Sequence, residues 1–167
     1  MNPTGRPEGE KRSAQREGRP AGTASARRRA RELALQGLYQ RQITGNADDQ
    51  IEADLVASAG YARADPVYFG ELWKGVTREY DDLVALVAPR LDRKAAELAP
   101  VERALLVIAA WELARRPDIP YRAVINEAIE LAKSYGGTDA HKFVNGVLDK
   151  LAPDLRAAEI RAAANRG

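Results

Sequence analysis

The segment from Pro100 to Leu113 constrains the fold of this chain more than any other part of its sequence. It begins with a proline, a residue that fits the first turn of a helix. Large apolar side chains then follow on nearly every side of the helix that this segment would form: Val101, Leu105, Leu106, Val107, Ile108, Trp111 and Leu113. A helix that is apolar around its whole circumference has to be buried. We therefore expect it to be the central helix of a larger helical domain.

Amphipathic helices are predicted on both sides of this central helix. Apolar residues recur at helical spacing over residues 25–43, 49–58, 66–89, 120–135 and 138–153. Ser25, Asp65 and Thr138 are the predicted N-caps, and Pro153 is expected to close the last core helix. Alanine, leucine, arginine and glutamate dominate the composition, which favours helix over sheet. The sequence thus predicts an all-α fold of about seven helices.

Basic residues are concentrated at one end of the chain. The first 31 residues hold nine arginine and lysine residues and three glutamates, although the formal net charge of the whole chain is only +2. Residues 1–24 carry almost nothing large and apolar, so a disordered basic tail is expected there. The helical domain is expected over residues 25–153, with a short terminal helix or tail over 154–167. The basic N-terminal segment favours a nucleic acid over a membrane surface as its partner, because it lacks the apolar residues that insert into lipid.

The composition argues against an enzyme. The chain has no cysteine and one histidine, so no catalytic site, metal site or cofactor is expected. The turn Gly136–Lys142 matches neither phosphate-binding glycine motif. A triad of Ser134, Asp139 and His141 is conceivable, but nothing nearby predicts an oxyanion hole. Without a membrane-spanning run or a secretory signal segment, the chain is expected to be cytoplasmic, with no membrane partner.

An arginine cluster opens the first predicted helix. Arg27, Arg28, Arg29 and Arg31 lie in its first turns, where positive charge opposes the helix dipole. Helix stability does not favour this placement, whereas a bound anion would. Guanidinium groups bind phosphates and stack on bases, and Tyr39 on the same helix offers a further stacking surface. From these residues alone the other interpretation, a solvated basic turn with a half-buried Tyr39, stays open.

Longer motifs give a more specific indication. Residues 126–133 read NEAIELAK and residues 141–149 read HKFVNGVLD. Together they resemble the signature of the bacterial transcription antitermination factor NusB family. The opening RRRARE of residues 27–32 and the VERALL of residues 101–106 are similar to that family as well. The resemblance runs in the correct order from about Arg27 to Pro153.

The resemblance implies a fold, an activity and partners. The fold would be two small helical bundles packed together. NusB proteins pair with the ribosomal protein NusE, and the pair binds the single-stranded boxA element of nascent RNA. In the RNA polymerase antitermination complex, this helps the polymerase to complete ribosomal RNA transcripts.

The resemblance also implies site residues. The RNA-contacting arginines of the family match Arg27, Arg28 and Arg31, its stacking tyrosine matches Tyr39, and Arg29 is added by adjacency only. A second RNA-facing patch matches Asp139, Lys142 and Phe143, and Glu102 falls where the family meets NusE.

Other interpretations remain open for some of these residues and for the function. Phe143 lies in an apolar stripe and fits a core position equally well, and Asp139 fits a first-turn anion that complements the helix dipole. A NusB-like domain is also the RNA-binding part of some ribosomal RNA methyltransferases, although no cofactor-binding α/β domain is predicted here. A helical protein-interaction module with an incidental basic end is the third class.

Overall fold

A computed structural model describes residues 23–166, and over these residues the chain is all-helical. The predicted tail therefore lies mostly outside the described residues. The α-helices are α1 (Ala24–Thr44), α2 (Asp48–Val56), α3 (Pro66–Arg78), α4 (Tyr80–Val87), α5 (Pro100–Arg115), α6 (Tyr121–Tyr135), α7 (Ala140–Leu155) and α8 (Ala157–Ala164). Short 3₁₀ helices span Ala59–Arg63, Ala88–Arg90 and Ala95–Glu97. The all-α prediction is confirmed.

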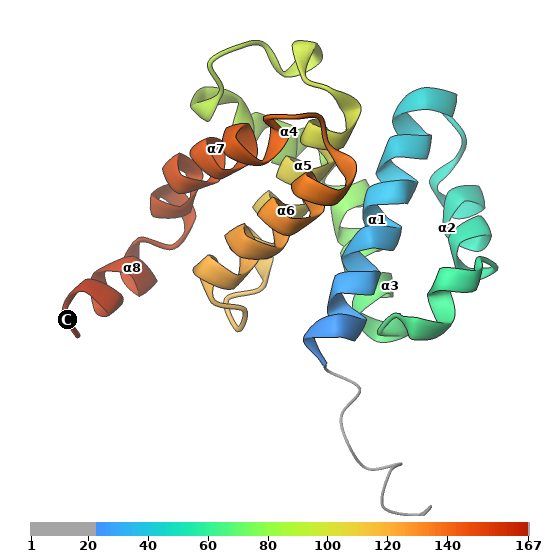
Figure 1. Cartoon of the computed structure of the whole chain (residues 1–167), viewed down its shortest axis with the longest axis horizontal. Coiled ribbons are helices and arrows are strands. Elements are labelled where there is room, and N and C mark those ends of the chain that lie inside the picture. The colour runs from blue at the N-terminus through green and yellow to red at the C-terminus, as the bar shows by residue number, and fades with distance from the viewer. Residues whose placement is uncertain (1–22, 167) are drawn as a thin grey trace, which may run out of the picture.

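The helices form two packed groups around α5. Helices α1, α2 and α3 lie on one side, and α4, α6 and α7 lie on the other (Figure 1). Helix α5 contacts α1, α3, α4, α6 and α7. Residues 104–113 of α5 are all buried, so the prediction of a central buried helix is confirmed.

Two glycines let the helices approach closely. A Cβ atom on Gly75 of α3 would lie 2.1 Å from Nε1 of Trp111 on α5. A Cβ atom on Gly37 of α1 would lie 2.5 Å from Cζ3 of Trp73 on α3. Both tryptophans are buried in the core. Because any side chain at these two positions would displace a packed indole ring, the contacts of α3 with α1 and α5 depend on glycine.

Several helix ends agree with the predictions and others differ. The Asp65 side chain accepts a hydrogen bond from the Tyr68 N–H at 3.0 Å, which makes it the expected N-cap of α3. Helix α1 starts earlier than predicted, since Thr23 rather than Ser25 is its N-cap. Gly45 ends α1 in a left-handed conformation with φ of 68°. Ile43, the last residue of the range predicted for this amphipathic helix, is 60% exposed in the last turn of α1.

The C-terminal end of α7 also corrects a prediction. Pro153 lies inside α7, which continues to Leu155. Only one backbone hydrogen bond is lost at a proline, and the Arg156 N–H still donates to the Ala152 carbonyl at 2.7 Å. The buried Arg156 side chain donates to the Leu113 carbonyl at 2.7 Å and thereby caps the end of α5.

Helix α7 begins at Ala140 with Asp139 at the N-cap position, one residue later than the predicted Thr138 cap. This shift places the Asp139 side chain at the exposed end of α7.

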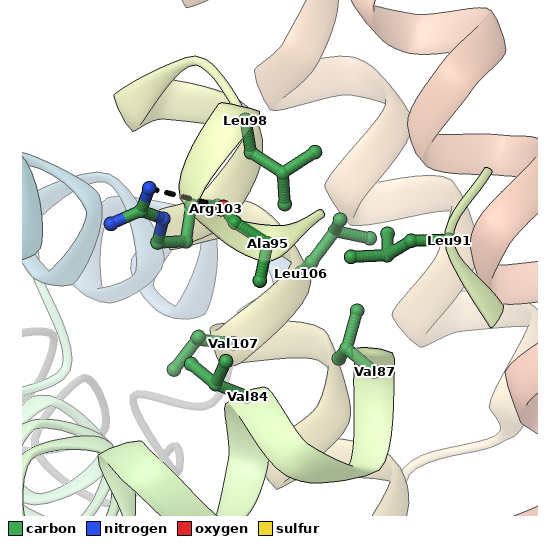
Figure 2. Close-up of a pocket in the computed structure, with 8 residues that line it drawn as sticks. All are labelled: Val84, Val87, Leu91, Ala95, Leu98, Arg103, Leu106 and Val107. Atoms are coloured by element: carbon green, nitrogen blue, oxygen red, sulfur yellow. Dashed lines mark hydrogen bonds between the residues drawn. The ribbon is translucent and has the colours of Figure 1, made fainter. Parts of the chain in front are cut away.

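An apolar pocket lies between α4, α5 and the segment that joins them (Figure 2). Val84, Val87 and Leu106 are among its lining residues, and Arg103 closes it by donating to the Ala95 carbonyl at 3.0 Å. Its volume of about 10 Å³ is close to that of one water molecule. It is a packing gap in the core and no ligand site. Among the described helices, none is long and apolar enough to cross a membrane.

Candidate RNA-binding interface

Two of the four predicted arginines lie on the surface at the start of α1. The Arg28 side chain is 47% exposed, and its Nε and Nη2 atoms donate to the Glu127 carboxylate on α6, each at 2.9 Å. This pairing raises the pKa of the Arg28 guanidinium. Arg29 is similarly exposed and donates from Nη1 to Glu32 at 2.8 Å. Both guanidinium groups retain accessible surface for an anion.

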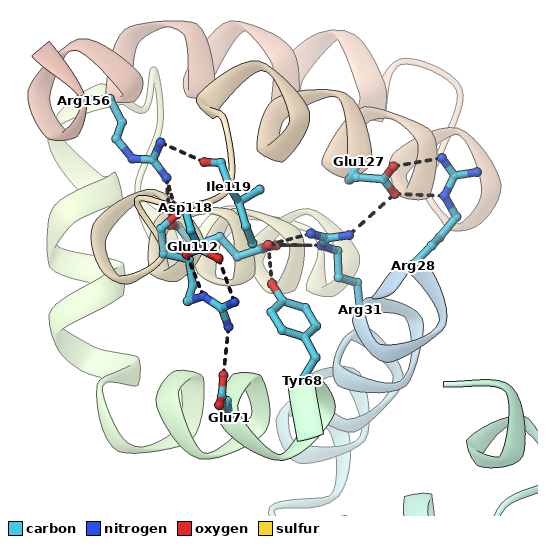
Figure 3. Close-up of polar contacts among 10 residues, drawn as sticks. Arg28, Arg31, Tyr68, Glu71, Glu112, Asp118, Ile119, Glu127 and Arg156 are labelled. Carbon is cyan, nitrogen blue, oxygen red and sulfur yellow. Dashed lines mark hydrogen bonds and ion pairs between the residues drawn. The ribbon is translucent and has the colours of Figure 1, made fainter. Parts of the chain in front are cut away.

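Arg31 lies in the interior instead. Its side chain is 5% exposed and forms a bidentate ion pair with Glu112 on α5, with Nε–Oε1 at 2.9 Å and Nη2–Oε2 at 2.8 Å (Figure 3). Burial alone would lower the pKa of this guanidinium, but the hydrogen bonds and charge of Glu112 outweigh burial and raise it. Arg31 cannot reach a phosphate in this conformation. The prediction of a direct RNA contact from Arg31 is therefore replaced by a structural role.

Tyr68 of α3 completes this buried network. Its hydroxyl donates to the Glu112 carboxylate, and burial together with that negative charge raises the pKa of the hydroxyl. The guanidinium carbons of Arg27, Arg31 and Arg116 lie 5.1, 5.4 and 5.0 Å from the centre of the Tyr68 ring. Arg27 is thus half-buried against an aromatic ring, because it lies one helical turn before Arg31 on the same face.

The network joins four helices at the start of α1. Glu127 of α6 contacts Arg28 directly and also approaches Nη1 of Arg31 at 3.9 Å. Helices α1, α3, α5 and α6 are thereby held together beneath the exposed arginines. Sequence reasoning missed Glu112 and Glu127 because their arginine partners lie 81 and 99 residues away along the chain.

Tyr39 lies on the surface of α1 and is 46% exposed. It lines a groove of about 340 Å³ together with Leu35 and Gln36 of α1, Val101 of α5 and Tyr135 of α6. Tyr39 thus leaves a little under half of its surface accessible for stacking, and the rest is covered by its neighbours. Gln36 belongs to the stretch of α1 that resembles the NusB family, but the sequence assigns it no site role, and Tyr135 is predicted only as the end of a helix.

The second predicted patch lies at the start of α7. Asp139 and Lys142 are both exposed, and Lys142 Nζ lies 3.6 Å from Asp139 Oδ1. Phe143 is partly buried against the core, and the Arg93 guanidinium carbon lies 4.5 Å from the centre of its ring. The core interpretation of Phe143 is thus partly met, since one part of it packs inward, and Arg93 covers its ring.

Glu102, the predicted NusE contact, is a half-buried residue in the first turn of α5. Among residues 23–166 no group of three or more histidine, cysteine, aspartate or glutamate side chains could hold a metal ion. The functional candidates are therefore polar and aromatic surface residues of α1, α5, α6 and α7.

A comparison with known proteins assigns the chain to a family. The model of the NusB family matches residues 28–153. The chain belongs to the NusB family. The transcription antitermination protein NusB of Nitrosomonas europaea is 54% identical over 140 residues, which cover 84% of each chain. That of Paraburkholderia phytofirmans is 52% identical over 142 residues, which cover 85% of this chain and 99% of the relative. The chain is accordingly a NusB-family transcription antitermination protein, and this family is not one of enzymes.

Solved structures show the same fold. NusB of T. maritima aligns with a TM-score of 0.72 at 28% identity, over 81% of this chain and 96% of that one. A NusB chain from a crystal structure of the antitermination factors NusB and NusE in complex with dsRNA aligns with a TM-score of 0.67 at 23% identity. That alignment covers 79% of this chain and 99% of the other. The NusB fold, with its two helical groups, is thus that of this chain.

Proposed function

We propose that this chain is a non-enzymatic RNA-binding adaptor that recognises single-stranded boxA RNA together with NusE. In this role it promotes antitermination of ribosomal RNA operons as part of the RNA polymerase antitermination complex. Membership in the NusB family supports the proposal. A related crystal structure holds NusB and NusE in complex with dsRNA, which supports NusE and an RNA as the partners of this fold.

The observation that carries this proposal is the surface of α1. Helix α1 presents an exposed tyrosine and an exposed arginine on one stripe of its surface. Arg28 and Tyr39 are eleven residues apart, so they lie within about 20° of each other around the helix and about 16 Å apart along it. The arginine suits a phosphate and the tyrosine suits the face of an unpaired base. A base in a duplex has no free face, so single-stranded RNA is the favoured ligand.

The second patch extends this surface with mixed charge. Lys142 is exposed and attracts phosphate, whereas the neighbouring Asp139 carboxylate repels it. We include Arg27 and Arg29 as weaker contributors, because Arg27 is partly covered by Tyr68 and Arg29 is paired with Glu32. Glu102 is proposed to face NusE.

An equilibrium titration tests the proposal. A fluorescently labelled boxA RNA and a scrambled RNA of equal length are titrated with the chain, with and without purified NusE. We expect boxA to bind more tightly than the scrambled RNA and NusE to increase that preference. Replacing Tyr39 by alanine should weaken boxA binding by about 1–3 kcal/mol, because one base loses its stacking partner. Equal affinity for the two RNAs in the presence of NusE would overturn the proposed function.

A further inference from the structure

The groove beside Tyr39 is lined by a second exposed aromatic residue. Tyr135, the last residue of α6, is 43% exposed and shares this groove with Tyr39, Gln36, Leu35 and Val101. Three helices contribute to it, namely α1, the start of α5 and the end of α6. Exposed aromatic side chains gathered in one concave site are a recurring mark of a binding surface.

The groove is held in place by the fold. Leu35 forms its buried floor, and Gln42 of α1 donates to the Pro100 carbonyl at 3.3 Å, which fixes α1 against the start of α5. Helix α6 stops directly after Tyr135, where the Gly136 N–H donates to the Ala132 carbonyl at 2.8 Å. A preformed site of this kind loses little conformational freedom when a ligand binds.

The position of Tyr135 joins the two parts of the proposed RNA surface. On one side lie Tyr39 and, further along the same stripe of α1, Arg28. On the other side Tyr135 is four residues before Asp139, at the turn that leads into α7 and Lys142. The groove therefore lies beside the turn that connects α6 to the start of α7, and an RNA strand that contacts both α1 and α7 can be bound there.

The chemistry of the groove fits one nucleobase. Two tyrosine rings offer faces on which any base can stack. The exposed Gln36 amide supplies both a donor and an acceptor for the edge of a base. The volume of about 340 Å³ is at the lower end of the range for small-ligand pockets, which suits a single planar group. No basic residue is among the residues that line the groove, so Arg28 and Lys142 suit phosphates further along the strand.

We propose that this groove binds one unpaired nucleobase of the RNA, with Tyr135 as a second stacking residue and Gln36 as a residue that reads the edge of the base. The proposal rests on the proposed RNA-binding function and adds Tyr135 and Gln36 to its site.

The test uses the full chain and a labelled single-stranded boxA RNA. Tyr135→Ala should weaken binding about 5- to 150-fold, the range that corresponds to the loss of one stacked base. The slope of log affinity against log salt should stay unchanged, because no phosphate contact is removed. Tyr135→Leu should also weaken binding, because it keeps apolar bulk without an aromatic face, whereas Tyr135→Phe should bind within about 2-fold of the parent chain. Since Leu conserves packing, the test holds even if the alanine variant does not fold.

A matched control and an altered RNA sharpen the result. Val56→Ala removes an exposed apolar side chain from α2, outside the groove, and should leave affinity unchanged. A series of RNAs with one base removed at a time should contain one position that weakens binding to the parent chain but not to Tyr135→Ala. Gln36→Ala should reduce the discrimination between bases at that position.

The outcomes separate the two proposals. If the parent chain does not bind single-stranded RNA, the proposed function fails. If the parent chain binds RNA but Tyr135→Ala and Tyr135→Leu bind equally well, only the base-binding groove is overturned. If these variants lose affinity for NusE and keep their affinity for RNA alone, the groove serves a protein partner and the inference is wrong.

Discussion

Arg28 and Arg31 lie three residues apart on α1, both pair with glutamates, and their surroundings are opposite. Arg28 is at the surface and pairs with Glu127, whose side chain is 17% exposed, whereas Arg31 and Glu112 are removed from water. An exposed ion pair is worth little to stability, because water and salt screen it and hydrate both partners well when they separate. A buried pair is different, since removing one partner leaves an uncompensated charge in the interior.

These two arginines of α1 therefore differ in role: Arg28 is accessible to an anion, and Arg31 stabilises the fold. The surface arginine can exchange its glutamate for a phosphate at small cost. The buried arginine instead ties α1 to α5, and Tyr68 adds a hydrogen bond from α3. We infer that the buried network of Arg31, Glu112 and Tyr68 positions the proposed RNA-binding surface. Substitutions at Arg28, at Arg31 and at the residues around them test whether binding and stability separate in this way.

The largest effect is expected for Arg31→Ala. This change should lower the free energy of unfolding by about 3–5 kcal/mol, because the Glu112 carboxylate would remain buried without its cation. Urea denaturation measures the change. The control is Arg29→Ala, which removes an exposed ion pair and should cost less than about 1 kcal/mol. Similar losses in the free energy of unfolding from both variants would mean that the buried and the exposed ion pairs contribute equally to stability.

Tyr68→Phe should have the second-largest effect. It removes one hydrogen bond to a charged carboxylate and keeps the ring that packs beneath the arginines, so a loss of about 1.5–3 kcal/mol is expected in the same denaturation experiment. RNA affinity of the folded variant should be unchanged. Tyr61→Phe, which alters a half-buried tyrosine outside this network, is the matched control.

Arg28→Ala should act on binding and hardly on stability. A single phosphate contact on single-stranded RNA contributes about 0.7 to the slope of log affinity against log salt, and the slope should fall by that amount. The unfolding free energy should change by less than about 1 kcal/mol. Glu127→Gln should act in the opposite direction and raise RNA affinity, because it releases the Arg28 guanidinium from a competing carboxylate. An unchanged salt slope for Arg28→Ala would place this arginine outside the interface.

Asp139→Asn is expected to give the smallest effect. Removal of one exposed negative charge beside the proposed RNA path should raise RNA affinity by less than about 1 kcal/mol, and added salt should diminish the gain. Glu52→Gln neutralises a carboxylate on α2, away from the path, and serves as the control. A loss of affinity would identify Asp139 as a positive contact or a structural cap of α7.

The sequence predicted the framework of the molecule because local patterns encode it. The apolar circumference of residues 101–113 requires burial, and Asp65-Pro66 and Gly45 mark helix ends through local hydrogen bonds and backbone conformation. The exposure of Arg28 also agreed with the prediction, whereas the sequence left the burial of Tyr39 open. The burial of Arg31 was not predicted, because it depends on a partner that is distant in the sequence. Nothing near Arg31 indicates that Glu112 will pair with it.

The groove was missed for the same reason. Tyr135 lies 96 residues after Tyr39 in the sequence, and only the packing of α6 beside α1 and α5 brings the two tyrosines into one site. Pro153 shows the converse, since a strong local signal for a helix end is overridden when the following residues can still complete a turn.

The central claim is that one continuous face, from the start of α1 across the end of α6 to the start of α7, binds unpaired RNA. Amide chemical-shift mapping of the isotope-labelled chain during titration with single-stranded boxA RNA tests it most directly. The account predicts the largest shifts around Arg28, Tyr39, Tyr135 and Lys142, and small ones in α2, in the outer face of α3 and in α8. Shifts concentrated in α2 and α3, with none near Tyr39 and Lys142, would contradict it.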